Sequence, residues 1–280
     1  MIKLNFEKAI APPKDGGALR FLYHNAFGRL LLRVLISRGV SKLAGAYLSS
    51  RLSKGLIKKF VRNNDIDLND FYSDDFKCFN DCFCRKIKDG KRPLEDGLIA
   101  PCDGLLSVYD IEDGLVLPIK QSKYSVADLL DDAELAREFD GGKVLVFRLC
   151  VNHYHRYHYF DDGVKGDNKF IKGKLHTVRP IALGQYPVFT QNCREMTVMQ
   201  TERFGKAVQI EVGAMLVGKI ANLHQSGPIK RGEEKGMFLY GGSTVVLLLQ
   251  KDAATLPEEL YENTRQGLET PVRMGQQIGE

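Results

Sequence analysis

The apolar positions near the start of the chain recur with the period of an α-helix. Over residues 19–35 they fall at i, i+3, i+4 and i+7, which is one face of a helix. Gly39 and Ser41 mark a stop and a new helix start. One apolar row then follows with Lys and Arg on its flanks: Leu48, Leu52, Leu56 and Phe60. The pattern predicts two amphipathic helices, followed by a short helix or turn at residues 67–70.

The pattern changes near residue 98. Short segments rich in Val, Ile, Leu and Tyr now alternate with Gly and Asp turns, as at 143–151 and 243–250. Regular short strands between turn signals indicate a β-rich body. One helix is expected near residues 125–139, and the polar tail after 256 reads as a surface helix or extension. We therefore predict an α+β fold with a mainly antiparallel β core, divided into a helical segment over 1–75 and a β-rich domain over 76–280.

Charge is distributed unevenly along the 280 residues, which carry a net charge of +5. The segment from Gly16 to Asn64 contains no acidic residue. Its basic residues are Arg20, Arg29, Arg33, Arg38, Lys42, Arg51, Lys54, Lys58, Lys59 and Arg62. The remainder is therefore mildly acidic. The longest apolar runs, such as 245–249, are far shorter than the roughly 20 residues of a membrane-spanning helix, so no span is predicted.

The cysteines do not indicate a metal site. Cys78, Cys82 and Cys84 have the spacing C-x3-C-x-C, which is not usual for structural zinc, and no matching His or Cys pair follows. The first residues also lack the apolar stretch of a secretory signal. We expect reduced thiols, no bound metal and a protein that faces the cytoplasm.

Three short motifs carry polar groups to the ends of apolar strands. Residues 239–249, LYGGSTVVLLL, place two hydroxyls at a strand start, although alone this is an ordinary hairpin turn and not a nucleophile elbow. Residues 153–158, HYHRYH, follow an apolar strand and alone form a polar turn. Residues 101–104, PCDG, form a tight turn in which an Asp commonly bonds its own backbone. Each motif by itself has a purely structural interpretation.

Taken together, the motifs resemble the phosphatidylserine decarboxylase family in order and spacing. The likeness runs from 79 to 249 and includes FNDCFCRKIKDGKRP at 79–93 and VGAMLVGKI at 212–220. Its most specific parts are Gly-Ser-Thr at 242–244 and Tyr-His-Arg-x-His at 154–158. Gly241 stands where the best-known members carry Leu, which affects only the subfamily. The resemblance implies a self-cleaving, pyruvoyl-dependent enzyme with a β-sandwich or barrel-like core that Ser243 enters.

The expected chemistry explains the serine. Loss of CO2 from an amino acid leaves a carbanion, and only a carbonyl cofactor bonded to the amine can accept its electrons. Ser243 Oγ would attack the Gly242 carbonyl to give an ester. Elimination would then break the chain, and the dehydroalanine would hydrolyse to a pyruvoyl group and ammonia. The products would be a large chain, 1–242, and a small chain, 243–280, which stay associated.

The resemblance also assigns the remaining roles. A serine needs a base to remove its proton, and a histidine oriented by a carboxylate is the usual arrangement. His158 is implied as that base, with Asp103 as its partner. His155 would lie beside the pyruvoyl group and the substrate. His153 and His176 are expected to be ordinary polar residues.

The basic amphipathic helices favour a lipid substrate. Such helices lie in the interface of a bilayer, and anionic lipids attract their basic residues. We predict a peripheral enzyme on the cytoplasmic face of the membrane that converts phosphatidylserine to phosphatidylethanolamine, with a homodimer in keeping with the family. A helix pair packed on its own domain, a soluble amino acid substrate such as tryptophan, and a non-catalytic lipid-binding β module remain alternatives. Without a reader motif, nucleic acid is not expected as a partner.

Overall fold

The computed structural model describes residues 4–12, 16–113, 115–119, 122–178, 180–183, 186–214, 219–241 and 243–280. Gly242, one half of the predicted cleavage site, lies outside the described residues.

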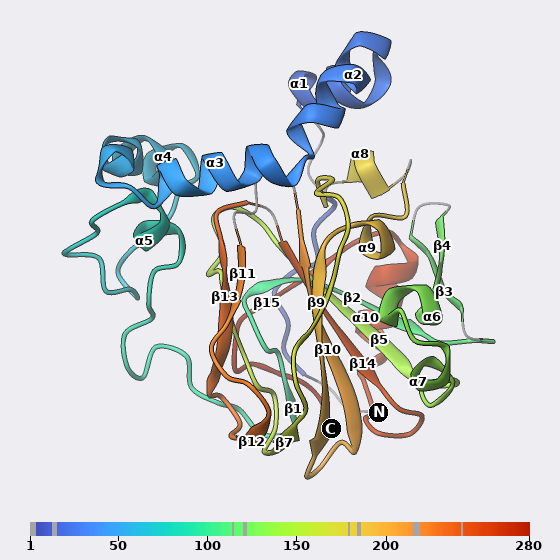
Figure 1. Cartoon of the computed structure of the whole chain (residues 1–280). Coiled ribbons are helices and arrows are strands. Elements are labelled where there is room, and N and C mark those ends of the chain that lie inside the picture. The colour runs from blue at the N-terminus through green and yellow to red at the C-terminus, as the bar shows by residue number, and fades with distance from the viewer. Residues whose placement is uncertain are drawn as a thin grey trace.

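A nine-stranded antiparallel sheet forms the centre of the protein (Figure 1). Strand β8 (Lys169–Ile171) pairs with β9 at its side. The other eight strands follow one another across the sheet in the order β12 (Gly227–Ile229), β7 (Gly163–Lys165), β9 (Arg194–Thr201), β10 (Lys206–Gly213), β14 (Ser243–Leu249), β5 (Lys143–Leu149), β2 (Gly104–Asp110) and β15 (Thr270–Val272). Hairpins and short loops can connect antiparallel neighbours of this kind.

Both faces of this sheet are buried, because side chains of β5 and β14 alternate between two cores. Val146 and Val246 belong to what we call the helix-side core. Short helices cover that face: α6 (Val126–Leu130), α7 (Ala133–Arg137), α8 (Pro180–Leu183) and α9 (Val188–Gln191). Leu145 and Leu247 belong to the opposite, strand-side core. Each large apolar side chain buried in this way contributes about 1.5–3 kcal/mol.

Smaller sheets cover the strand-side core. One has three strands in the order β11 (Lys219–Asn222), β13 (Glu234–Leu239) and β6 (Arg156–His158). Another pairs β1 (Leu98–Ile99) with β16 (Gln277–Gly279), and β3 (Leu115–Ile119) pairs with β4 (Ser122–Ser125) elsewhere. The predicted α+β class with a mainly antiparallel core is confirmed, whereas the described sheets do not close into a barrel. In the tail, α10 (Glu258–Arg265) is the expected surface helix.

The basic N-terminal segment forms a series of short helices, which we call the helical arm (residues 17–63). Its elements are α1 (Gly17–His24), α2 (Ala26–Leu35), α3 (Arg38–Leu48), the 3-10 helix η1 (Arg51–Leu56) and α4 (Ile57–Asn63). Figure 1 shows α1 and α2 standing beyond the β body and α3 lying across its end. No described helix has the length and apolarity needed to cross a membrane.

Polar side chains break each of the two predicted arm helices. Asn25 ends α1 and caps α2, because its side chain accepts hydrogen bonds from the N–H groups of Phe27 and Gly28. The helices cross closely there: a Cβ at Gly28 would lie 2.0 Å from the Phe21 carbonyl oxygen. The second helix breaks after α3, where Ser53 Oγ donates to the Leu48 carbonyl at 2.9 Å. Helical periodicity alone does not reveal such breaks, since the apolar rows continue across them.

The arm is attached to the body by a few buried residues and exposes many apolar ones. Tyr23, Leu32 and Ile36 pack into the helix-side core. Leu48 and Phe60 pack with Phe79 and Phe83 of α5 (Phe79–Phe83). The large apolar side chains that the arm exposes are Phe21, Phe27, Leu30, Leu31, Val34, Leu43, Tyr47, Leu52 and Leu56.

Candidate active site

Strand topology gathers the predicted site residues at one end of the central sheet. Ser243 is the first residue of β14 and pairs with Leu149, the last residue of β5. On its other side it pairs with Gly213, the last residue of β10. Strand β2 starts beside the same end of β5, directly after Asp103. The turn that leads to His155 leaves this end as well. Residues far apart in sequence are therefore neighbours along one edge.

Ser243 is fully buried, and its Oγ has no hydrogen-bond partner among the described residues. It alternates with Val245 and Leu247, so its side chain faces the strand-side core, the face that the sheet containing β6 covers. Burying a hydroxyl without a hydrogen-bond partner lowers the stability of the fold by about 1–3 kcal/mol. Such a group in a native structure therefore suggests a chemical role. Gly241, two residues earlier, has φ 132°, a backbone conformation that favours glycine.

His155 is a buried, neutral histidine with one unpaired nitrogen. Its ring packs on Phe83 with 3.9 Å between ring centroids. Nδ1 lies 2.9 Å from the His153 carbonyl oxygen, which can only accept, so Nδ1 carries the proton. Nε2 then presents a lone pair that has no partner among the described residues. Burial, aided by the Arg85 charge, holds the pKa of His155 well below its ordinary value.

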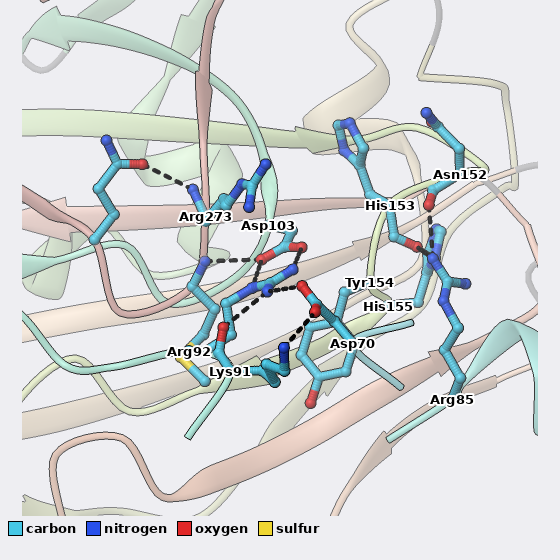
Figure 2. Close-up of polar contacts among 12 residues, drawn as sticks. Asp70, Arg85, Lys91, Arg92, Asp103, Asn152, His153, Tyr154, His155 and Arg273 are labelled. Carbon is cyan, nitrogen blue, oxygen red and sulfur yellow. Dashed lines mark hydrogen bonds and ion pairs between the residues drawn. The ribbon is translucent and has the colours of Figure 1, made fainter. Parts of the chain in front are cut away.

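Arg85 holds the turn that precedes His155, a role that the sequence did not indicate. Its Nη2 donates to the carbonyl oxygens of Asn152 at 2.6 Å and His153 at 3.0 Å (Figure 2). Its guanidinium lies 4.5 Å from the Phe71 ring centre. The sequence marks Arg85 only as a charged residue within a stretch rich in aromatic residues and cysteine, at 79–85.

His158, the predicted base, ends β6 with both ring nitrogens engaged. Nδ1 lies 3.1 Å from the Gly232 carbonyl oxygen and so carries the proton. Nε2, 3.1 Å from the Tyr154 hydroxyl, therefore accepts a hydrogen bond from it. Burial lowers the pKa of His158 and raises that of Tyr154, so both groups are neutral near pH 7. The nitrogen that could accept a proton is thus present and capped by Tyr154.

Asp103 lies close to β6 but is bound by an arginine. Arg92 donates to it through Nε at 3.3 Å and Nη2 at 3.0 Å, and the Met274 N–H donates at 2.8 Å (Figure 2). The backbone N–H of His158 donates to the Pro101 carbonyl at 2.8 Å, which places β6 beside the Asp103 turn. No hydrogen bond among the described residues joins Asp103 to His158. The carboxylate is shared between Arg92 and a backbone amide, and the Asp103–His158 pairing stays a prediction.

A pocket of about 310 Å³ opens on the Asp103 side of this arrangement. Arg85, Arg92, His153 and Tyr154 line it together with Asp103. Ser243, His155 and His158 are not among the described residues that line it. Tyr154 therefore stands between this pocket and the His158 ring.

A buried ion pair joins the two sheets behind β6, and sequence reasoning missed it. Lys235 Nζ lies 2.7 Å from Glu211 Oε2, and both side chains are 0% exposed. Asn222 Oδ1 accepts from the same Nζ at 3.1 Å. Lys235 falls at an irregular step in the pairing of β13 with β6, between Glu234 and Gly236. The pair therefore fixes β13 against β10. Because β13 pairs with β6, this contact also supports the strand that carries His158.

The clustered cysteines have structural contacts. Cys78 begins α5 in a capping box with Asp81, and Cys84 Sγ donates to the Phe238 carbonyl at 3.1 Å. All six cysteines are free thiols. Within the described part of the chain, no three His, Cys, Asp or Glu side chains are grouped so as to hold a metal ion.

Comparison with known proteins identifies the family. The phosphatidylserine decarboxylase family model matches residues 79–280, so the chain belongs to this family. It is 44% identical over 268 residues to phosphatidylserine decarboxylase proenzyme 2 of Clostridium acetobutylicum, covering 94% of this chain and 92% of the relative. A phosphatidylserine decarboxylase proenzyme of Ruminiclostridium cellulolyticum is 39% identical over 273 residues, covering 94% and 91%. The family predicted from the motifs is confirmed.

Proposed function

We propose that this chain is a proenzyme that cuts itself between Gly242 and Ser243 and then decarboxylates phosphatidylserine to phosphatidylethanolamine. Membership of the family and the proenzyme names of its relatives support the activity. The observation that supports the cut position is the buried Ser243 hydroxyl, which has no partner among the described residues and stands at the start of a core strand.

The first step is attack of Ser243 Oγ on the Gly242 carbonyl. Glycine at 242 adds no side chain to obstruct the attack. His158 takes the serine proton, and its lowered pKa keeps it unprotonated for this task at neutral pH. Since Tyr154 caps Nε2, that hydroxyl turns away as the proton arrives. Asp103 supports the charge that forms on His158 from the neighbouring turn.

The surroundings of residue 243 fit a pyruvoyl group. The group is made from Ser243 itself, so no separate binding site is needed, and residue 243 is buried between β5 and β10 where water is excluded. The group supplies a carbonyl that draws electrons from the bond to the departing CO2. The neutral His155 offers Nε2 as an acceptor to the substrate, and His158 returns a proton to the product. Strand β14 keeps the small chain bound, because it pairs with neighbours on both sides.

The helical arm places the enzyme on a membrane. Its exposed apolar side chains enter the interface, and its basic residues contact anionic lipids on the cytoplasmic face. A soluble amino acid would not require such a surface. Vesicles containing labelled phosphatidylserine, compared with free labelled amino acids, test this choice. Turnover of free amino acids alone would reject the lipid substrate.

A pair of adjacent hydroxyls tests the cut. Ser243→Ala should leave one uncut chain without decarboxylase activity. Thr244→Val is the matched control, since Thr244 is also buried with an unpartnered hydroxyl in the described structure, and it should still cut. Cleavage of the Ser243→Ala chain at this bond would refute the nucleophile.

A further inference from the structure

A second pocket, of about 460 Å³, lies between the helical arm and the body. One wall is α2, and the other is formed by Lys174, His176 and Tyr186. Its lining residues combine cationic and apolar side chains: Ala26, Arg29, Leu30, Leu32, Arg33, Ile36, Lys174, His176 and Tyr186. It shares no lining residue with the pocket at Asp103.

The charged groups of this pocket are all cationic. Arg29 and Arg33 are one turn apart on α2 and therefore lie on the same face, and Lys174 adds a cation from the opposite wall. No carboxylate lines the pocket among the residues that the structure describes. Guanidinium groups match the geometry of phosphate oxygens, so a phosphate would relieve the mutual repulsion of these side chains.

His176, which also lines the pocket, has a buried ring nitrogen without a partner in the described part of the chain. The Thr177 N–H donates to the Tyr23 oxygen at 3.2 Å, which leaves the Tyr23 hydrogen to donate to His176 Nδ1 at 3.3 Å. Burial, with the nearby Lys174 charge, lowers the pKa of His176 to about 4, so the ring is neutral and its hydrogen is on Nε2. That N–H is buried without a partner among the described residues, and the ring is 2% exposed.

The side chains around the pocket indicate an amphiphilic ligand. Leu30 lines it and is 59% exposed, while Phe27 and Val34 on the same helix are 70% and 56% exposed. A ligand with a phosphate and an acyl chain would satisfy the cations and cover this apolar surface at once. A free phosphate would satisfy only the cations.

We propose that this pocket binds the phosphate of an anionic phospholipid of the bilayer, as a site separate from the pocket at Asp103. The proposal rests on the proposed docking of the helical arm. The bound lipid holds α2 against Lys174, His176 and Tyr186 at the membrane surface. It requires no amine, because it does not react.

The direct test uses a monomeric lipid, so that no membrane surface potential contributes. Calorimetric titration of the full chain with dihexanoyl-phosphatidylglycerol should show saturable binding of one lipid per chain. The variant Arg29→Gln/Arg33→Gln/Lys174→Gln should lose about tenfold or more in affinity. The control Lys77→Gln/Lys219→Gln/Lys251→Gln removes three exposed charges of the body and should bind as the parent does. Equal losses in both variants, or no saturable binding, would overturn the site.

Two further experiments are needed. The first distinguishes a lipid phosphate from free phosphate, and the second distinguishes the pocket from membrane docking. Inorganic phosphate should bind about tenfold or more weakly than the lipid, because it buries no apolar surface, and equal affinity would overturn the lipid assignment. Sedimentation with phosphatidylcholine vesicles containing phosphatidylglycerol tests docking by itself. Vesicle binding without monomer binding would reject only the pocket, whereas absence of vesicle binding would reject the docking of the arm. Release of CO2 from dihexanoyl-phosphatidylserine reports the decarboxylase separately.

Discussion

The helical arm and the β body use apolar side chains in opposite ways. In the body they alternate between two closed cores, and polar groups such as Ser243 and His155 are buried with them. In the arm many of them face outward among basic residues, as Phe27 and Leu30 do. The body therefore obtains its stability internally, whereas the arm presents a surface that needs a partner. Stability and membrane binding should respond to different substitutions.

Among variants that keep Ser243, the largest effect is expected at the proposed base, His158. Removing a general base slows the chemical step by about 10²–10⁴-fold, so His158→Ala should slow self-cleavage by that factor. His224→Ala is the control, because that histidine is exposed. The rate is measured by following the large and small chains over time. Cleavage of His158→Ala at the parent rate would remove His158 from the mechanism.

The buried ion pair should show how strongly the body depends on internal contacts. Lys235→Met leaves the Glu211 carboxylate buried without its cation and should lower the free energy of unfolding by about 3–5 kcal/mol. The double variant Glu211→Met/Lys235→Met removes both charges and should recover much of that loss. Urea unfolding measures both. A single variant as stable as the parent would show that the pair does not hold the sheets together.

Acid should weaken the body through its buried histidines. Burial lowers the pKa of His153 and His176 to about 4, from an ordinary value of 6.5. Between these values the unfolded chain binds more protons than the folded one, so the free energy of unfolding falls as the pH falls. Each should contribute a loss of roughly 2 kcal/mol between pH 6.5 and 5. Urea unfolding across this pH range should show the fall in the free energy of unfolding. A His153→Gln/His176→Gln variant should lack the contribution of these two histidines to that fall. An unchanged slope would contradict the assignment.

Substitutions in the arm sharpen the contrast. Phe27→Ser should weaken vesicle binding by about 1.5–3 kcal/mol, because the Phe side chain no longer enters the bilayer. The same change should alter the free energy of unfolding by only about 0.5 kcal/mol or less, since Phe27 is 70% exposed. Leu32→Ser on the same helix is the matched opposite: Leu32 is 2% exposed, so stability should fall. Sedimentation with vesicles and urea unfolding should be measured on both variants. Loss of stability in Phe27→Ser, together with loss of vesicle binding but not of stability in Leu32→Ser, would contradict the contrast between arm and body.

The smallest effect is expected at Tyr154. Tyr154→Phe removes one hydrogen bond to His158 Nε2, worth about 0.5–1.5 kcal/mol. Freed of this donor, His158 should have a higher pKa and accept the serine proton more readily. Self-cleavage should therefore become about 2–10-fold faster, and its pH midpoint should rise. A slower variant would instead make Tyr154 a required donor.

The sequence predicted those features that depend on local pattern. Helical periodicity located the arm, and short apolar segments between turn signals located the strands. The motifs named Ser243, Asp103 and the His155–His158 segment as candidates. The cap at Asn25 and the break after Leu48 escaped prediction, because a polar side chain can interrupt a helix without interrupting its apolar row.

Contacts between distant segments could not be read in the same way. Three such contacts join residues that are far apart in the sequence. Arg92 binds the Asp103 carboxylate, and Arg85 donates to the carbonyls of residues 152 and 153. Lys235 forms an ion pair with Glu211. His176 was expected to be an ordinary polar residue, yet it is buried because Tyr23 of the arm packs against it. These features follow from the tertiary arrangement, which no spacing along the chain specifies.

The mass of the purified protein tests the central claim most directly. Self-cleavage before Ser243 predicts two chains, 1–242 and 243–280, with the small chain lighter by one ammonia than a chain that begins with serine. A single species of 31.5 kDa under conditions that permit processing would contradict it.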